Sequence, residues 1–435
     1  MAMFPGAQGG DILAWRGISE LVGEIRRRSA EQMSYLLADE GVALLKELKG
    51  RLEAEIAFEE EFAAGFSRAM AALDSARYED ELASLFPRFT RLAEEHFLRR
   101  GSVVALHALC TTWRDALLCR VVHLVEENLL LEGAGRAPAP FCWLASGSIG
   151  RGEPTFCVEP AHVLIYGDIP PGGTGWFDQF FSRALALAGK AGLAKNDGRG
   201  TVMKSLWRGS RTEWRREIVE ELAGGERGRL DELVRRADLR FLCGDEALAA
   251  EMIGVVRSMI EFHHEELRET SKSAAAASRT RTALSFPLPA LRGMGKGIAE
   301  MPTGLDFFSR LRVEKRGRQR GKFDLEQFAL APLVTNIRML AIYGALHETG
   351  TIARIKGLQA VGVLSVELTE RLLRAYHDFT RLKIGRQLAE GCESEQGCFI
   401  DPQALTADEG ERLRNGLETV AGLEKIAYLR FTEQG

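Results

Sequence analysis

The sequence FCWLASGSIGRGE at residues 141–153 carries the strongest indication of the fold. Its first five residues are apolar, and a short apolar run that ends in turn residues is typical of a buried strand. Gly147 and Ser148 form the turn, and we expect a helix after it. Backbone N–H groups at such a turn, with the dipole of a helix behind them, favour an anion such as phosphate. We therefore predict phosphate contacts from Gly147, Ser148 and Arg151. The alternative is a turn that uses glycine for its geometry alone, with the arginine in a surface ion pair.

A second apolar run follows at His162–Tyr166, and we interpret it as the next strand of the same domain. Gly167 and Asp168 then begin a turn, and residues 178–191 have the spacing of an amphipathic helix. Strands that alternate with helices are typical of a small α/β domain. The two strands are predicted to be neighbours in one mixed sheet.

Helical patterns lie on both sides of this domain. Leu44, Leu48 and Leu52 recur at helical spacing before it, and Ile337 and Leu340 do so after it. We therefore predict an α+β protein, with a small mixed-sheet domain between two helical domains. The predicted order is an N-terminal helical module at 1–135, the α/β domain at 136–265, a basic irregular connecting segment at 266–321 and a C-terminal helical domain at 322–435.

Composition restricts the kinds of partner. The chain has 435 residues, 46% of them hydrophobic, and a formal net charge of −4, so it has no general bias toward nucleic acid or an anionic membrane. No run is apolar over the roughly 18 residues that a membrane span needs, and Met1–Trp15 lacks the pattern of a signal peptide; we expect a cytoplasmic protein. The seven cysteines include no C-x-x-C pair and indicate neither a disulfide framework nor a zinc site. Cys157 is expected to be a small buried residue.

Three further segments have structural interpretations. Trp207 and Trp214, seven residues apart, are expected on one face of a helix. Asp238 and Arg240 are expected to pair with each other, a catalytic role being the alternative. Residues 312–322 contain six basic residues and one acid. They are expected to form an exposed hairpin or loop, and the alternative is contact with nucleotide phosphates or an acidic partner.

The stretch at residues 141–153 resembles a nucleotidyltransferase family related to the bacterial PII-protein uridylyltransferases. That family has the motif W-L-x-x-G-S-x-G-R-x-E, which is matched by Trp143, Leu144, Gly147, Ser148, Gly150, Arg151 and Glu153. The resemblance continues at Val202-Met203, at Trp207-Arg208 to Trp214, at Asp238-Leu239-Arg240 with Gly244-Asp245, and at the start of the C-terminal helical domain, including Arg338. It covers about residues 114–431 and implies a nucleotidyltransferase-like fold with a C-terminal helical domain.

The resemblance also implies a metal site, from which this sequence departs. Members of the family carry two acidic residues at the start of the strand after the turn, in a sequence like T-D-Q-D-N-A-L-I, where they bind Mg²⁺ for nucleotidyl transfer. Here Glu159 takes the first acidic position and Ala161, which cannot bind a metal, takes the second. Glu159 is therefore the expected catalytic residue and metal ligand of a degenerate site, and His162 is expected to be a packing residue. Candidates for supporting roles are Glu153, Asp168, Asp238 and Arg240.

Three functions are compatible with these residues. The first is a signalling protein that binds a nucleoside triphosphate at the Gly147–Ser148 turn, with nucleotidyl transfer weakened or lost. The second is an active transferase that moves a uridylyl or adenylyl group to a protein. The third is a helical scaffold that binds no nucleotide. The expected partners are the triphosphate and a regulatory protein, PII-like or other, contacted through the helical domains; neither nucleic acid nor a membrane is expected.

Overall fold

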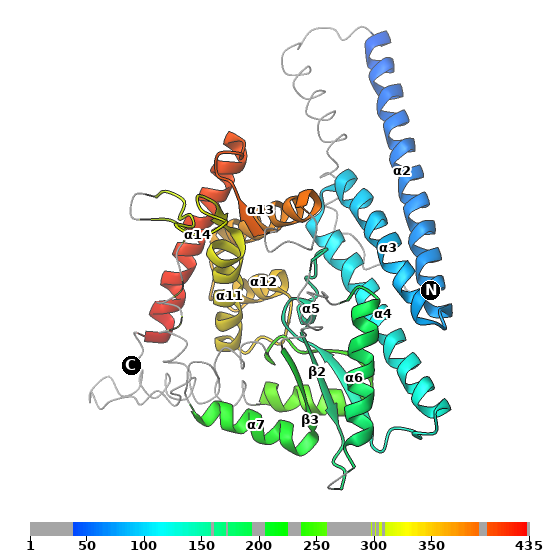
Figure 1. Cartoon of the computed structure of the whole chain (residues 1–435). Coiled ribbons are helices and arrows are strands. Elements are labelled where there is room, and N and C mark those ends of the chain that lie inside the picture. Colours follow the sequence, from blue (N-terminus) through cyan, green and yellow to red (C-terminus); the bar gives the residue numbers. More distant parts are fainter. Residues whose placement is uncertain are drawn as a thin grey trace, which may run out of the picture. The chain divides into compact units, whose positions relative to one another are not determined.

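The computed structural model describes residues 38–157, 161–170, 173–193, 205–224, 236–258, 304–306, 309–390 and 398–432, together with residues 297 and 301 (Figure 1). The chain divides into two compact units, Met1–Arg120 and Val121–Gly435. The boundary between the units, after Arg120, lies within the helix Val103–Leu131, whereas the N-terminal module was predicted to end after that helix, at residue 135. The α/β part and the C-terminal helices, predicted as separate domains, belong to the same compact unit.

The described part of the first unit, from residue 38 on, consists of helices. They are α2 (Ala38–Ser75), α3 (Glu79–Arg100) and α4 (Val103–Leu131), the last of which continues into the second unit. The carboxylate of Glu81 accepts a hydrogen bond from the N–H of Tyr78 at 3.1 Å, which satisfies a donor at the start of α3. Gly101, in the left-handed region with φ 63°, ends that helix. Phe89 and Trp113 stack in the core with ring centroids 4.7 Å apart.

The second unit is built around a four-stranded mixed sheet. Its strands are β1 (Phe141–Ala145), β2 (Ala161–Tyr166), β3 (Ser205–Ser210) and β4 (Arg240–Gly244), in the order β3-β2-β1-β4. β1 is antiparallel to both β2 and β4, while β2 and β3 are parallel. The predicted neighbours β1 and β2 are thus confirmed, as is the α+β fold class.

Both faces of the sheet are covered, which explains why β1 is a continuous apolar run. Alternate residues of a strand point to opposite faces. Trp143 packs on one face against helix α6 (Gly175–Lys190), with its ring 5.8 Å from that of Phe181. Cys142 and Leu144 contribute to the core on the other face. That core also includes residues of α7 (Arg211–Gly224) and of the helical segment at residues 246–258.

The two tryptophans expected on one helical face lie in different elements. Trp207 is in β3 and Trp214 is in α7, and their rings pack edge to face at 4.8 Å. The prediction of a shared helical face is therefore wrong. A separation of seven residues is equally compatible with a strand, a tight turn and the first turn of a helix.

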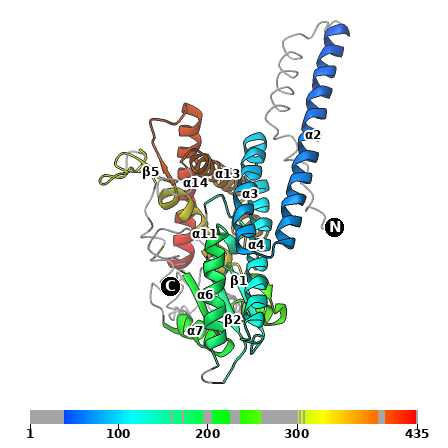
Figure 2. The ribbon, with the colours of Figure 1, turned by 45° about the vertical axis from the view of Figure 1, so that its right-hand side comes forward.

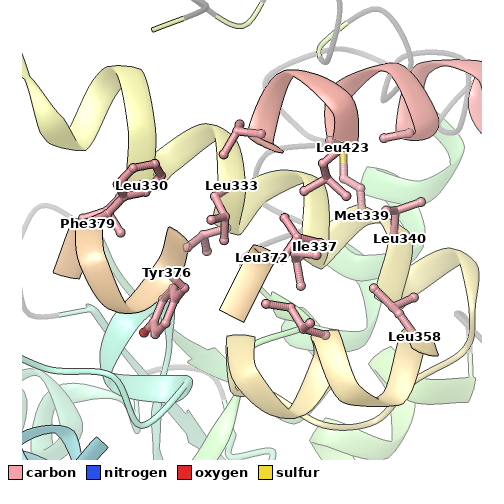
Figure 3. Close-up of a cluster of buried hydrophobic side chains, with 14 of the residues drawn as sticks. Leu330, Leu333, Ile337, Met339, Leu340, Leu358, Leu372, Tyr376, Phe379 and Leu423 are labelled. Atoms are coloured by element: carbon pink, nitrogen blue, oxygen red, sulfur yellow. The ribbon is translucent and has the colours of Figure 1, made fainter. Parts of the chain in front are cut away.

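The C-terminal helices complete the core under the sheet. The elements are β5 (Phe323–Asp324), the π-helix η2 (Glu326–Leu330), α11 (Ala331–Tyr343), α12 (Thr351–Ala360), α13 (Val366–Glu390), β6 (Phe399–Ile400) and α14 (Ala407–Thr432). Leu333, Ile337 and Leu340 project from one face of α11 and pack with Leu358 and Leu423 from neighbouring helices (Figure 3). Since these residues share one core with Leu144 and Val163 of the sheet, the helices and the sheet fold as a unit.

The structure also bears on the expectations about membrane spans and about Cys157. Among the described residues, no helix is both long and apolar enough to cross a membrane. Cys157, expected to be a small buried residue outside any disulfide, is half-buried and disulfide-bonded, and its partner lies outside the described residues. The absence of a C-x-x-C pair could not exclude a bond between cysteines that are distant in sequence.

Candidate functional site

The turn after β1 is tight and short. The N–H of Ser146 donates to the carbonyl of Ala161 at 2.8 Å, so the turn is tied to the start of β2. Gly147 has φ +59°, a conformation that favours glycine, and α5 (Gly147–Gly150) is a single helical turn. The predicted helix behind the turn is thus too short for a substantial dipole. Among the described residues, no backbone acceptor is found for the N–H of Gly147 or of Ser148.

Position 161 faces this turn. A Cβ atom built on Gly147 would lie 3.5 Å from the Cβ of Ala161, in ordinary van der Waals contact. The residue at the second acidic position of the family is therefore next to the predicted phosphate site, as the resemblance implies, but its methyl group cannot bind a metal. Glu159, the first acidic position, lies outside the described residues. His162 is buried and packs edge to face on Trp143 at 6.1 Å, in agreement with its expected packing role.

The side chain of Arg151 is engaged inside the protein. Its Nε donates to Glu153 at 2.7 Å and its Nη1 donates to Asp238 at 2.9 Å. The Arg151 side chain is only 10% exposed. Burial by itself would lower the pKa of Arg151, but the two carboxylates raise it above its ordinary value. In place of the predicted phosphate contact, the structure gives Arg151 internal ion pairs.

Asp238 is the centre of a buried ionic group, which we call the Asp238 cluster: Arg151, Glu153, Asp238, Arg338 and Arg354. Asp238 is fully buried and accepts hydrogen bonds from three guanidinium groups. Arg354, on α12, donates its Nη1 at 2.5 Å, and Arg338, on α11, also donates directly. Burial by itself would raise the pKa of the Asp238 carboxyl, but the arginines hold it below its ordinary value. The carboxylate therefore stays charged.

The expected pair between Asp238 and Arg240 is replaced by other contacts. Asp238 is bound by arginines from α11, from α12 and from the turn after α5, whereas Nη2 of Arg240 donates to the carbonyl of Ile149 at 3.1 Å. Arg240 thus connects β4 to the turn at α5. The preferred interpretation, a structural role for both residues, fits these contacts better than the catalytic alternative.

Glu153 connects the turn to the C-terminal helices. Its carboxylate accepts hydrogen bonds from the N–H of Thr351 and, at 3.0 Å, from the hydroxyl of Thr351. Thr351 is the first residue of α12, where a carboxylate is favoured by the helix dipole and by the unpaired N–H groups of the first turn. Burial, followed by the nearby Glu153 carboxylate, raises the pKa of Tyr376 on α13. Glu153 is consequently a structural acid at this position.

Asp168 lies away from the turn. It follows the last residue of β2, whereas the Gly147–Ser148 turn is beside the first residue, Ala161. Six strand residues separate these ends by about 20 Å. Asp168 is exposed and accepts a hydrogen bond at 3.0 Å from the N–H of Thr212, in the first turn of α7. That hydrogen bond lowers the pKa of Asp168. The residue caps a helix and does not support the predicted site.

The described residues do not provide a magnesium site at the turn. No group of three or more His, Cys, Asp or Glu residues in the described part of the chain is arranged to hold a metal ion. Glu153 and Asp238 are the acids of the family motifs that are tied to the turn through Arg151. The carboxylates of both accept hydrogen bonds from Arg151, and that of Glu153 also accepts one from Thr351. Position 161 has no oxygen ligand of the kind that Mg²⁺ requires, and the carboxylates at positions 153, 168 and 238 accept hydrogen bonds from protein groups.

Two arginines of the cluster had a sequence signal of their own. Arg338 and Arg354 each interrupt an apolar helical stretch, NIRMLA and TIARI. A charge that replaces an apolar residue on the buried face of a helix requires a buried counter-ion. This signal indicates that both arginines are paired, but it does not identify Asp238 as their partner.

Two family models match the chain. Residues 87–226 match a family described as "Putative nucleotidyltransferase DUF294", and residues 289–431 match one described as "Putative nucleotidyltransferase substrate binding domain". Comparison with curated proteins found no match. The first region contains Arg151 and Glu153, the second contains Arg338 and Arg354, and Asp238 lies between them. The Asp238 cluster therefore joins the two matched regions.

Proposed function

The chain belongs to this two-domain nucleotidyltransferase family, and from that premise we propose that it binds a nucleoside triphosphate at the Gly147–Ser148 turn with little or no nucleotidyl transfer. The observation that carries the proposal is the turn itself, where two backbone N–H groups have no backbone acceptor among the described residues and Ala161 faces them. Backbone N–H groups that converge in this way bind phosphate oxygens. In this proposal the backbone and the Ser148 hydroxyl make the contacts, and Arg151 holds the turn in shape.

The loss of transfer follows from the acid pair. Mg²⁺ in such enzymes neutralises phosphate charge and activates the attacking hydroxyl, and each 1.4 kcal/mol of lost transition-state stabilisation slows the reaction about tenfold. With alanine at position 161, Glu159 is the one acid left of the pair. The C-terminal helices, which match a substrate-binding family, would then receive a regulatory protein, PII-like or other, and transmit nucleotide binding to it.

Calorimetric titration with ATP, UTP, CTP and GTP, with and without Mg²⁺, tests the proposal. We expect binding of at least one triphosphate, little change in affinity on adding Mg²⁺, and no labelling of a PII-type acceptor from radioactive UTP or ATP. Metal-dependent labelling would instead establish an active transferase. Absence of binding by all four triphosphates would favour a scaffold without a nucleotide site.

Ser148→Glu is expected to weaken triphosphate binding by at least about tenfold, because it places a carboxylate where phosphate oxygens accept hydrogen bonds; this corresponds to about 1.4 kcal/mol. Ser148 is half-exposed, so the longer side chain can be accommodated. Ser258→Glu, at an exposed position of the helical segment 246–258, adds the same charge elsewhere and is the control. Equal affinities of the two variants, measured by calorimetry, would exclude the turn as the phosphate site.

Ala161→Asp is expected to make triphosphate affinity depend on Mg²⁺, increasing it by about tenfold when the metal is present. The new carboxylate would lie beside Gly147 and would restore an acid two residues after Glu159, the spacing of the family's acid pair. Ala161→Asn has nearly the same shape without the charge and is the matched control. A Mg²⁺ effect of the same size in both variants, or in neither, would contradict the assignment of position 161 to the metal site.

A further inference from the structure

A hairpin rich in arginine lies just before β5. Residues 312–322, here called the basic hairpin, form a defined structure in which the N–H of Glu314 donates to the carbonyl of Lys322 and the N–H of Gly321 donates back to Glu314, both at 2.8 Å. Gly317 and Gly321 have φ +78° and +83°, which permits the tight reversal. In Figure 2 the segment before β5 projects from the helices of its unit. The prediction of an exposed hairpin or loop is confirmed.

The basic hairpin has a firm base. At its start, the N–H of Arg312 donates to the carbonyl of Gly304 at 3.0 Å, and Leu305 and Leu311 form a β-bridge. At its end, Phe323 is fully buried and pairs with Ile400 of β6. Both ends are thus fixed to the C-terminal helical region, so the tip is presented in a set direction.

The positive charges of the basic hairpin are not neutralised within the described part of the chain. The basic residues are Arg312, Lys315, Arg316, Arg318, Arg320 and Lys322, against the single acid Glu314. All but Lys322 are exposed. None of the six forms an ion pair with a described residue, although arginines elsewhere, such as Arg412 with Asp408, do so. Six like charges within eleven residues repel one another, and an anionic partner would remove this repulsion.

The chemistry of the basic hairpin favours carboxylates of a protein over nucleic acid. Residues 309–322 contain no aromatic side chain, whereas single-stranded nucleic acids are usually held by stacking on aromatic rings as well as by charge. Four of the six basic residues are arginines, whose planar guanidinium groups bind carboxylates through two parallel hydrogen bonds.

We propose that the basic hairpin docks an acidic surface of a protein partner. The hairpin belongs to the region that matches a substrate-binding family, so the partner would be the protein on which the C-terminal helices act. This docking does not require nucleotide: it depends on the hairpin alone and would persist if the Gly147–Ser148 turn bound no triphosphate.

The test measures binding of labelled poly-L-glutamate to the full chain by fluorescence anisotropy, without nucleotide. The triple variant Arg316→Glu, Arg318→Glu, Arg320→Glu should bind at least about tenfold more weakly, since three exposed ion pairs become repulsive. The control variant changes the net charge by the same amount at three exposed helical arginines without ion pairs to described residues: Arg88→Glu, Arg91→Glu and Arg371→Glu. Its affinity should remain close to that of the unmodified chain.

Two further measurements distinguish the partner class. Raising the salt concentration from about 0.1 M to about 1 M, which shortens the Debye length from about 10 Å to about 3 Å, should abolish poly-L-glutamate binding. A single-stranded RNA of equal net charge should bind no more tightly than the peptide. Equal poly-L-glutamate affinities of the hairpin and control variants would overturn the proposal. Tighter RNA binding that is lost in the hairpin variant would also overturn it, and would assign the hairpin to nucleic acid.

Discussion

Replacing Asp238 with Asn is expected to destabilise the unit Val121–Gly435 by about 3–5 kcal/mol, the range for removing one partner of a buried ion pair. Asp238 is fully buried and is bound by Arg151, Arg338 and Arg354. The neutral amide leaves three guanidinium groups with Glu153 as the remaining carboxylate of the cluster. Burial, followed by the nearby Arg151, lowers the pKa of Arg338 to about 10.

Urea unfolding, followed by tryptophan fluorescence, measures this effect. Asp408→Asn is the control, because Asp408 forms an exposed pair with Arg412, and its loss should change the free energy of unfolding by less than about 1 kcal/mol. The arginines hold the pKa of Asp238 below its ordinary value of 3.8. The stability from its charge is therefore present above pH 3.8 and is lost as the pH falls through the lowered pKa. The Asp238→Asn variant should lack the loss of stability that accompanies protonation of Asp238. If Asp238→Asn lowered the free energy of unfolding no more than Asp408→Asn does, the cluster would contribute little to stability.

Gly150→Ala should also destabilise the second unit, by about 3 kcal/mol or more, the upper end of the cost of inserting a methyl group into a packed site. A Cβ at position 150 would lie 2.1 Å from the carbonyl oxygen of Asp238 and 2.9 Å from that of Ala145. Both obstacles are backbone atoms, one in β1 and one in the turn before β4, so neither can move aside like the end of a flexible side chain. The substitution must displace α5 or the Asp238 cluster.

Gly385→Ala is the matched control for this substitution. Gly385 is an exposed residue of α13, and a Cβ there would meet no atom within 4 Å. Alanine in a helix interior is favoured over glycine by about 1 kcal/mol, so this variant should be slightly more stable than the unmodified chain. Thermal unfolding of both variants gives the comparison. An unchanged melting temperature in Gly150→Ala would contradict the close packing of Gly150 against the backbone of Asp238.

The sequence predicted the elements whose signals are local. The five apolar residues at 141–145 and the run at 162–166 indicated two strands, and the structure pairs Phe141 with Tyr166 and Ala145 with His162. The glycine turn between the strands was also predictable, because glycine is common at tight turns, and the φ of +59° at Gly147 is a conformation that favours it.

The candidate site was predicted less well, because its contacts are not local. Arg151 lies one helical turn after Ser148, which suggested a shared anion. The anion that it binds is Asp238, 87 residues further along the chain. Spacing along a helix carries no information about such a partner. The resemblance marked Arg151, Glu153 and Asp238 as motif residues, but it could not distinguish residues that contact a ligand from residues that maintain the fold.

The long separations within the Asp238 cluster affect how the protein is made. Glu153 and Thr351 are 198 residues apart, and a ribosome that adds about 5–20 residues per second needs roughly 10–40 s to synthesise the chain between them. During this interval β1 has already been synthesised while α12 does not yet exist. The apolar side chains of Cys142 and Leu144 lack the helices that will cover them, and the Glu153 carboxylate lacks Thr351. One face of the sheet is therefore synthesised many seconds before the helices that cover it, and exposed apolar surface of this kind favours aggregation.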